Sequence, residues 1–152
     1  MVYRDWEGFK VRELCIFMGY EFLEHTADVK FRAEGSSLDE MFVAAAEAMN
    51  ETVRGDIKIL EQEERSFEVE GKDDVGLLYN FLEEFLFLLD AEDFLVAKIK
   101  SIEIKDNKLK CVVVGDAAEN YKFTNDVKAV TYSDMFVREE NGKFVCEVVL
   151  DV

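Results

Sequence analysis

Apolar and polar side chains alternate from Tyr20 to Ala33, a pattern typical of a half-buried strand. Ser37 followed by Glu40 has the spacing of a capping box, which marks the start of a helix. Apolar positions then recur at helical spacing and stop before Gly55. These positions are Leu38, Met41, Phe42, Ala45, Ala48 and Met49. The pattern predicts a first helix that packs closely against a sheet.

A second strand and helix are predicted further along the chain. Arg65 to Glu70 alternates as a strand does, and the following turn ends at Asp74, which we expect to be the N-cap of the helix. The helix has a broad apolar face. Its members are Leu77, Leu78, Phe81, Leu82, Phe85, Leu86 and Leu89. The aromatic density could mark a partner-binding face, but we expect the face in the core, because an exposed stripe of this size would aggregate.

The second half of the chain has the pattern of strands. The predicted strands are Phe94 to Lys98, Ile102 to Lys105, Leu109 to Val114, Val127 to Thr131, Met135 to Arg138 and Phe144 to Val152. Asn141-Gly142 is a strong hairpin signal between the last two. Gly115 to Asn125 lacks periodicity and is predicted to be a loop. Asp151 therefore stands at the end of a strand.

Two helices and several strands without regular β–α alternation predict an α+β fold. We expect a two-layer arrangement, with two main helices packed on a largely antiparallel, mixed β-sheet. The chain has 152 residues, no proline and no linker or repeat, so one domain is sufficient. A hydrophobic share of 49% argues against disorder.

The formal charge of −16 comes from 34 acidic and 18 basic residues. Nucleic-acid binding depends on cationic contacts to phosphates, so direct nucleic-acid binding is not expected. An acidic surface suits a basic protein partner or attracts cations, or it only maintains solubility.

Catalytic and zinc motifs are lacking. Cys15, Cys111 and Cys146 have no Cys-x-x-Cys spacing, which makes zinc improbable. Cys111 and Cys146 lie in apolar, strand-like runs, which indicates buried thiols. The chain has one histidine, no Gly-x-Ser-x-Gly elbow and no phosphate loop, so it does not resemble an enzyme. There is no membrane-spanning run, and the acidic start is unlike a signal peptide, so a cytoplasmic location is expected.

Asp28 and Asp151 are candidate ligands for a hard cation if the fold brings them together. Two side-chain carboxylates and the terminal carboxylate of Val152 are oxygen ligands of the kind that calcium and magnesium prefer. Without a cation, such a cluster would be repulsive. Either aspartate alone is more typical of a solvated turn or a helix cap than of a metal ligand.

Four stretches together carry a family resemblance. They are Tyr20 to Val29 with its His-Thr-Ala-Asp, Leu38 to Met49 with its alanine run, Val127 to Tyr132, and Val148 to Val152. In this order and separation they resemble the archease family, over about Met18 to Val152. The resemblance implies an archease-like fold for residues 18–152.

The resemblance also implies a metal site. Asp28 and Asp151 match the family's metal ligands, and Val152 would add a main-chain or terminal oxygen. Calcium is the implied ion, and magnesium would fit if waters complete an octahedron. His25 would act as a base or ligand only if the chain turns after it, and our favoured interpretation is a structural histidine that orients the aspartate loop. Thr26 would brace the same turn.

Lys128, Thr131 and Tyr132 belong to the late motif and are candidate supporting or partner-contact residues. Lys128 would contact a nucleotide phosphate or a partner carboxylate, or it would pair with a neighbouring acid such as Asp126. Many family members carry histidine where Ser133 stands, so no role is assigned to Ser133.

Archeases are protein cofactors of the RtcB-type RNA ligase, which joins tRNA halves. The resemblance implies a non-catalytic activator in tRNA splicing that promotes ligase guanylylation and multiple turnover and broadens nucleotide use. The alternative is a chaperone-like binding module for RNA-processing proteins with a purely structural metal. A metal-dependent hydrolase using His25 as base is a third possibility.

Residues 1–17 lie outside the family pattern, and two interpretations stay open. They form an N-terminal extension that packs through Val11, Leu14, Ile16 and Phe17, or the working start is at Met18.

Overall fold

The computed structural model describes residues 19–24, 28–124 and 127–152. Its strands are β1 (Gly19–Leu23), β2 (Val29–Gly35), β3 (Glu63–Glu70), β4 (Phe94–Lys105), β5 (Lys108–Ala117), β6 (Ala129–Glu140) and β7 (Lys143–Asp151). Its helices are α1 (Leu38–Arg54), α2 (Asp74–Glu92) and the short 3-10 helix η1 (Ala118–Asn120). Neither α-helix is long and apolar enough to cross a membrane, judged on the described residues.

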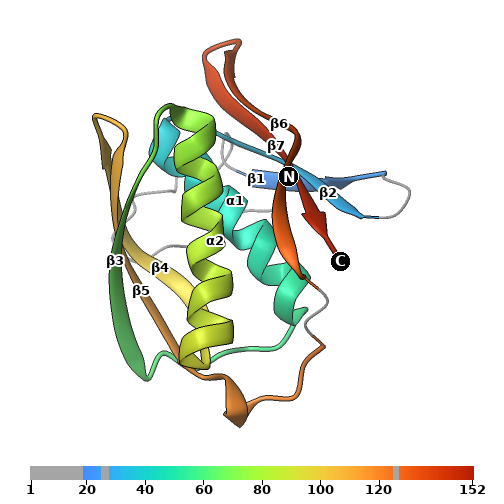
Figure 1. Cartoon of the computed structure of the whole chain (residues 1–152), viewed down its shortest axis with the longest axis vertical. Helices are drawn as coiled ribbons and strands as arrows, with labels where there is room; N and C mark the ends of the chain where they lie inside the picture. The colour runs from blue at the N-terminus through green and yellow to red at the C-terminus, as the bar shows by residue number, and fades with distance from the viewer. Residues whose placement is uncertain (1–18, 25–27, 125–126) are drawn as a thin grey trace.

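The strands form two antiparallel sheets, one in the order β1-β2-β7-β6 and the other in the order β3-β5-β4. The helices lie between them (Figure 1), and each helix contacts both sheets. The α+β class with antiparallel strands is confirmed. The division into two sheets was not predicted. Its physical reason is visible in α1, where every residue from Phe42 to Ala46 is buried and the helix therefore needs cover on more than one side.

The first helix begins where the sequence predicts. The Ser37 hydroxyl accepts a hydrogen bond from the Glu40 amide at 3.2 Å. The Glu40 carboxylate accepts bonds from the amide and hydroxyl of Ser36, at 3.1 and 2.6 Å, rather than from the Ser37 amide. The cap therefore uses both serines, and the helix ends before Gly55 as expected.

The second helix is capped by Asp73, so the prediction of Asp74 was wrong by one residue. Asp73 is extended, with φ −153°, and its side chain accepts the Gly76 amide at 2.8 Å, whereas Asp74 is already helical. The predicted apolar face is buried from Leu77 to Leu86, and Leu88 is buried too. Leu89 is only partly buried.

Several predicted strand boundaries were wrong. The segment from Tyr20 to Ala33 is two paired strands, because alternation continues on both arms of a hairpin and does not reveal the reversal. β4 is continuous through two bulges, and β5 continues to Ala117 before η1. β6 is also continuous, with an irregularity between Thr131 and Phe136.

The predicted turn and thiol environments are confirmed. Asn141 and Gly142 have φ of 52° and 79°, the left-handed values that a two-residue hairpin turn of this type requires. Cys111 and Cys146 are buried, and burial raises the pKa of each thiol to about 12. Cys15 lies outside the described residues.

Candidate functional site

Asp28 and Asp151 lie at the same end of the β2–β7 strand pair. Val29 pairs with Leu150 in the antiparallel register, and one residue beyond this pair stand Asp28 on one side and Asp151 on the other. Continuing an ideal register would leave the two Cα atoms about 5 Å apart. Both residues are half-buried. The fold therefore brings the start of β2 next to the end of β7, as the metal hypothesis requires.

Asp151 is held from its other side by β6. Ala129 pairs with Asp151, and the Lys128 amide donates to the Asp151 carbonyl at 2.7 Å. No side-chain hydrogen bond or ion pair reaches the Asp151 carboxylate from the described residues. The side chain of the next residue, Val152, packs against the core. The main chain at Asp151 is thus fixed, whereas its carboxylate is available to a ligand.

Thr131 lies on the same face of the sheet, two residues along β6. It pairs with Val149, which shares its face with Asp151 because alternate strand residues point the same way. Its Oγ1 atom is buried and has no hydrogen-bond partner in the part of the chain that the structure describes. An orphaned buried hydroxyl costs free energy unless a partner is supplied.

Two basic residues of β2 near this strand end have acidic partners. Lys30 Nζ lies 3.4 Å from Glu147 Oε1, and Arg32 bonds Glu147 at 2.9 Å and Glu140 at 3.0 Å. Glu147 and Glu140 thus neutralise much of the positive charge next to Asp28. The Lys128 side chain is exposed and forms no ion pair with a described residue.

The donor set fits a hard divalent cation. Carboxylate and main-chain oxygens meet here, and such oxygens suit calcium or magnesium rather than zinc. No three His, Cys, Asp or Glu side chains cluster in metal-binding proximity among the described residues. Asp28, Asp151 and Val152 would therefore hold an ion together with water. Metal binding here stays a prediction.

The remaining candidate residues are not shown at the strand end that carries Asp28 and Asp151. Tyr132 turns away from Asp151 and stacks on Tyr79 of α2, with ring centroids 4.3 Å apart. The predicted roles of His25, Thr26 and the Asp126 partner of Lys128 fall outside the described residues. Sequence reasoning missed Tyr79 and Phe87. Phe87 lies off the predicted apolar face of α2. An aromatic residue at that position could have indicated an exposed aromatic side chain.

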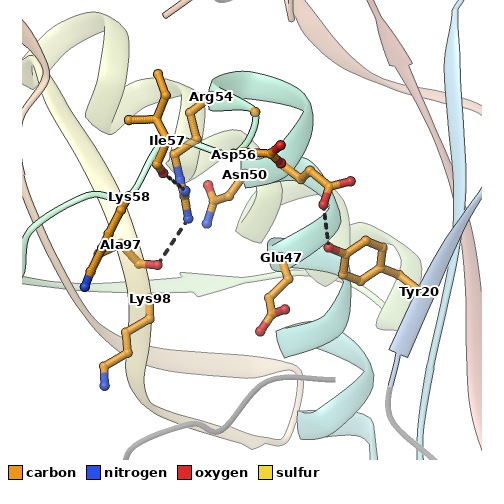
Figure 2. A pocket seen from close by; sticks show the side chains of 11 residues that line it. Tyr20, Glu47, Asn50, Arg54, Asp56, Ile57, Lys58, Ala97 and Lys98 are labelled. Atoms are coloured by element: carbon orange, nitrogen blue, oxygen red, sulfur yellow. Dashed lines mark hydrogen bonds between the residues drawn. The ribbon is translucent and has the colours of Figure 1, made fainter. Parts of the chain in front are cut away.

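A cavity of about 360 Å³ lies elsewhere, at the C-terminal end of α1 (Figure 2). Arg54 donates to the carbonyls of Ile57 and Ala97 at 2.7 and 3.3 Å, and the Tyr20 hydroxyl donates to Glu51 at 3.1 Å. Its described lining contains no serine, cysteine or histidine and no residue of the candidate metal site. It has no nucleophile–base arrangement of the kind that covalent catalysis needs.

Comparison with known proteins is consistent with this fold. Residues 20–152 match the family described as Archease protein family (MTH1598/TM1083). Protein archease from Pyrococcus abyssi is 40% identical over 141 residues, covering 88% of this chain and 98% of the relative. Protein archease from Methanothermobacter thermautotrophicus is 37% identical over 138 residues, covering 88% and 99%.

Two solved structures share the fold. The solution structure of Methanobacterium thermoautotrophicum protein 1598 matches with a TM-score of 0.73 and 35% identity, covering 88% of this chain and 99% of that one. The crystal structure of a Thermotoga maritima archease, described as a possible chaperone, matches with a TM-score of 0.62 and 19% identity, covering 86% and 94%. The family match over residues 20–152, together with relatives this similar along nearly their whole length, shows that the chain belongs to the archease family.

Proposed function

We propose that this archease is a non-catalytic activator of the RtcB-type RNA ligase in tRNA splicing. It would promote ligase guanylylation and multiple turnover, broaden the nucleotides that the ligase accepts, and act in the cytoplasm. The observation that carries the proposal is the meeting of Asp28 and Asp151 at one strand end. Two neighbouring carboxylates with main-chain oxygens beside them are a donor set that suits a hard divalent cation.

Different residues of the chain would bind the cation and contact an anionic group. Asp28, Asp151 and the main chain of Val152 would hold calcium, or magnesium with more waters. A bound divalent cation supplies positive charge that offsets negative charge developing on phosphate oxygens. The Lys128 amide fixes the Asp151 main chain, and the exposed Lys128 ammonium stands at the same strand end to contact an anionic group.

The rest of the molecule favours a helper over an independent enzyme. The described cysteines are buried thiols with a pKa of about 12, so they are poor nucleophiles. The charge of −16 opposes direct RNA binding and favours a protein partner.

The second candidate is a chaperone-like module for RNA-processing proteins. The description of the Thermotoga maritima archease as a possible chaperone favours it, as do the exposed aromatic side chains Phe87 and Tyr132. In this case the metal would only stabilise the strand end.

The test is ligase guanylylation and multiple-turnover ligation with archease at one tenth of the ligase concentration. Wild-type archease should raise both, and Asp28→Asn or Asp151→Asn should remove at least about nine tenths of the effect, because single charge-stabilising groups are commonly worth tenfold or more. Asp56→Asn, an exposed aspartate beyond α1, is the matched control and should activate normally.

Normal activation by both carboxylate variants would refute the metal site. A requirement for stoichiometric archease, with protection of unrelated client proteins, would favour the chaperone-like module.

A further inference from the structure

Two large aromatic side chains are exposed beside α2. Phe87 is 52% exposed and Tyr132 of β6 is 56% exposed. Tyr132 stacks on Tyr79 of α2 with an angle of 14° between the rings, and the Tyr79 hydroxyl donates to Glu83 at 3.0 Å. Tyr79, Glu83 and Phe87 are four residues apart, so they follow one face of the helix. We call Tyr79, Phe87 and Tyr132 the aromatic strip.

The strip extends over about two turns of α2. Tyr79 and Phe87 are eight residues apart, which is about 12 Å along the helix axis. Figure 1 shows α2 and β6 at the front of the molecule, and the two elements are in contact. Aromatic side chains are enriched at the centres of protein interfaces. Single exposed aromatics are common, whereas here Phe87 lies about two helical turns along α2 from the stack of Tyr79 on Tyr132.

A hollow of about 600 Å³ lies at the Tyr132 end of the strip. It is lined by Glu70, Gly71, Lys72, Asp73, Val75, Gly76, Asn80 and Tyr132. A Cβ atom on Gly76 would lie 3.2 Å from Asp73 Oδ1 and 3.7 Å from the Tyr132 hydroxyl, so glycine keeps the space between them open. The hollow offers an aromatic ring and two carboxylates. These groups recognise a guanidinium, which stacks on rings and pairs with carboxylates.

The surroundings of the strip are acidic. Glu83, Glu84 and Asp90 lie on or beside the same length of α2, which has no basic residue between Asp74 and Glu92. A complementary partner surface is therefore basic.

We propose that the aromatic strip and the hollow form the docking surface for a basic face of a protein partner, with a partner arginine stacked on Tyr132 between Glu70 and Asp73. This inference rests on the proposed function, in which the partner is the RNA ligase. Tyr132 follows Ala129, the pair of Asp151, by three residues, or about 10 Å along β6. Because Tyr132 faces away from Asp151, a partner docked on the strip would reach the carboxylate pair around β6, which is the edge strand of its sheet.

Measuring ligase binding and ligase activation separately distinguishes docking by the aromatic strip from activation by the carboxylate pair. The dissociation constant of purified ligase is measured by titration calorimetry for wild type, Tyr132→Ala, Phe87→Ala and the double variant. The double variant should bind at least about tenfold more weakly, as loss of interface hot spots does. Tyr132→Phe keeps the ring and should bind within about twofold of wild type. Leu60→Ala, an equally exposed apolar side chain at 49%, is the matched control and should also stay within about twofold.

A separate variant tests the negative charge of the hollow. Asp73→Asn keeps a good N-cap while removing the carboxylate. It should weaken ligase binding and reduce the dependence of binding on salt concentration. Circular dichroism and thermal unfolding verify that each variant is folded.

The outcomes are distinguishable. If wild type binds the ligase and the double variant binds equally well, the docking surface is wrong and the proposed function stands. If Asp28→Asn binds normally but fails to activate, while the double variant activates at saturating concentration, both proposals are supported.

If wild type neither binds nor activates the ligase, both are overturned. If wild type binds single-stranded RNA without ligase and Tyr132→Ala loses that binding, the strip is an RNA surface and the protein-docking proposal is overturned.

Discussion

Asp116 and Asp151 stand near the ends of β5 and β7, an interior strand of each sheet, but their carboxylates have opposite environments. Asp116 is 7% exposed and accepts bonds from the Tyr121 hydroxyl and the Ala117 amide at 2.8 Å, and from Asn120 at 3.4 Å. Asp151 receives no such donor from the described side chains, and its neighbour beyond the strand pair is another aspartate, Asp28.

The difference is between a carboxylate whose hydrogen bonds are satisfied by the protein and one that we propose binds a cation. A buried charge is tolerated where the protein satisfies its hydrogen bonds, as it does at Asp116. The Tyr121 hydroxyl also accepts the Leu60 amide at 2.9 Å, so this network fixes the segment before β3. At Asp151 the protein fixes the main chain, while no described side chain donates to the carboxylate, which we propose is a cation ligand.

The largest expected effect comes from replacing each aspartate with alanine in metal-free buffer. Asp116→Ala leaves the Tyr121 and Asn120 donors without their acceptor and should lower the Tm by roughly 8 °C. Asp151→Ala removes repulsion with Asp28 and should shift the Tm by less than about 2 °C. Differential scanning calorimetry with chelator present compares them. Equal losses would show that Asp151 is structural as well.

A smaller, pH-dependent effect is expected for Tyr121→Phe. The Tyr121 hydroxyl lowers the pKa of Asp116 below its usual 3.8, assisted by the Ala117 amide and Asn120 and opposed by burial. A lowered pKa stabilises the fold above the unfolded value, and this contribution is lost as pH falls through the folded value. The Tm difference from wild type should be roughly 4 °C at pH 7 and should shrink near pH 3.

The Leu60 bond is independent of pH in this range, so part of the Tyr121→Phe difference should persist in acid. A difference that grows as pH falls would contradict the assignment of Asp116. Thermal unfolding by circular dichroism at both pH values is the measurement.

Local signals in the sequence predicted local structure well. The helix start at Ser37 and the hairpin turn at Asn141-Gly142 each depend on residues at most four positions apart. The structure confirmed both. Asp73 and Asp74 are chemically equivalent neighbours, so the sequence could not choose the cap. Alternation from Tyr20 to Ala33 reports which side chains are buried but not where the chain reverses.

Pairings between distant segments could not be predicted from pattern. The division into two sheets depends on which strands meet, and the stack of Tyr79 on Tyr132 joins a helix to a strand of different periodicity. The pairing of Asp28 with Asp151 was expected from the family resemblance, and the register of β2 on β7 now gives its physical basis.

The most direct test of the central claim is the effect of calcium on thermal unfolding of wild type and Asp151→Asn. A ligand that binds only the folded state stabilises it by about 1.4 kcal/mol at ten times its dissociation constant, which raises the Tm by roughly 3 °C. Wild type should show this rise and Asp151→Asn should not. An equal rise in both proteins, or none in wild type, would contradict a cation site built on Asp151.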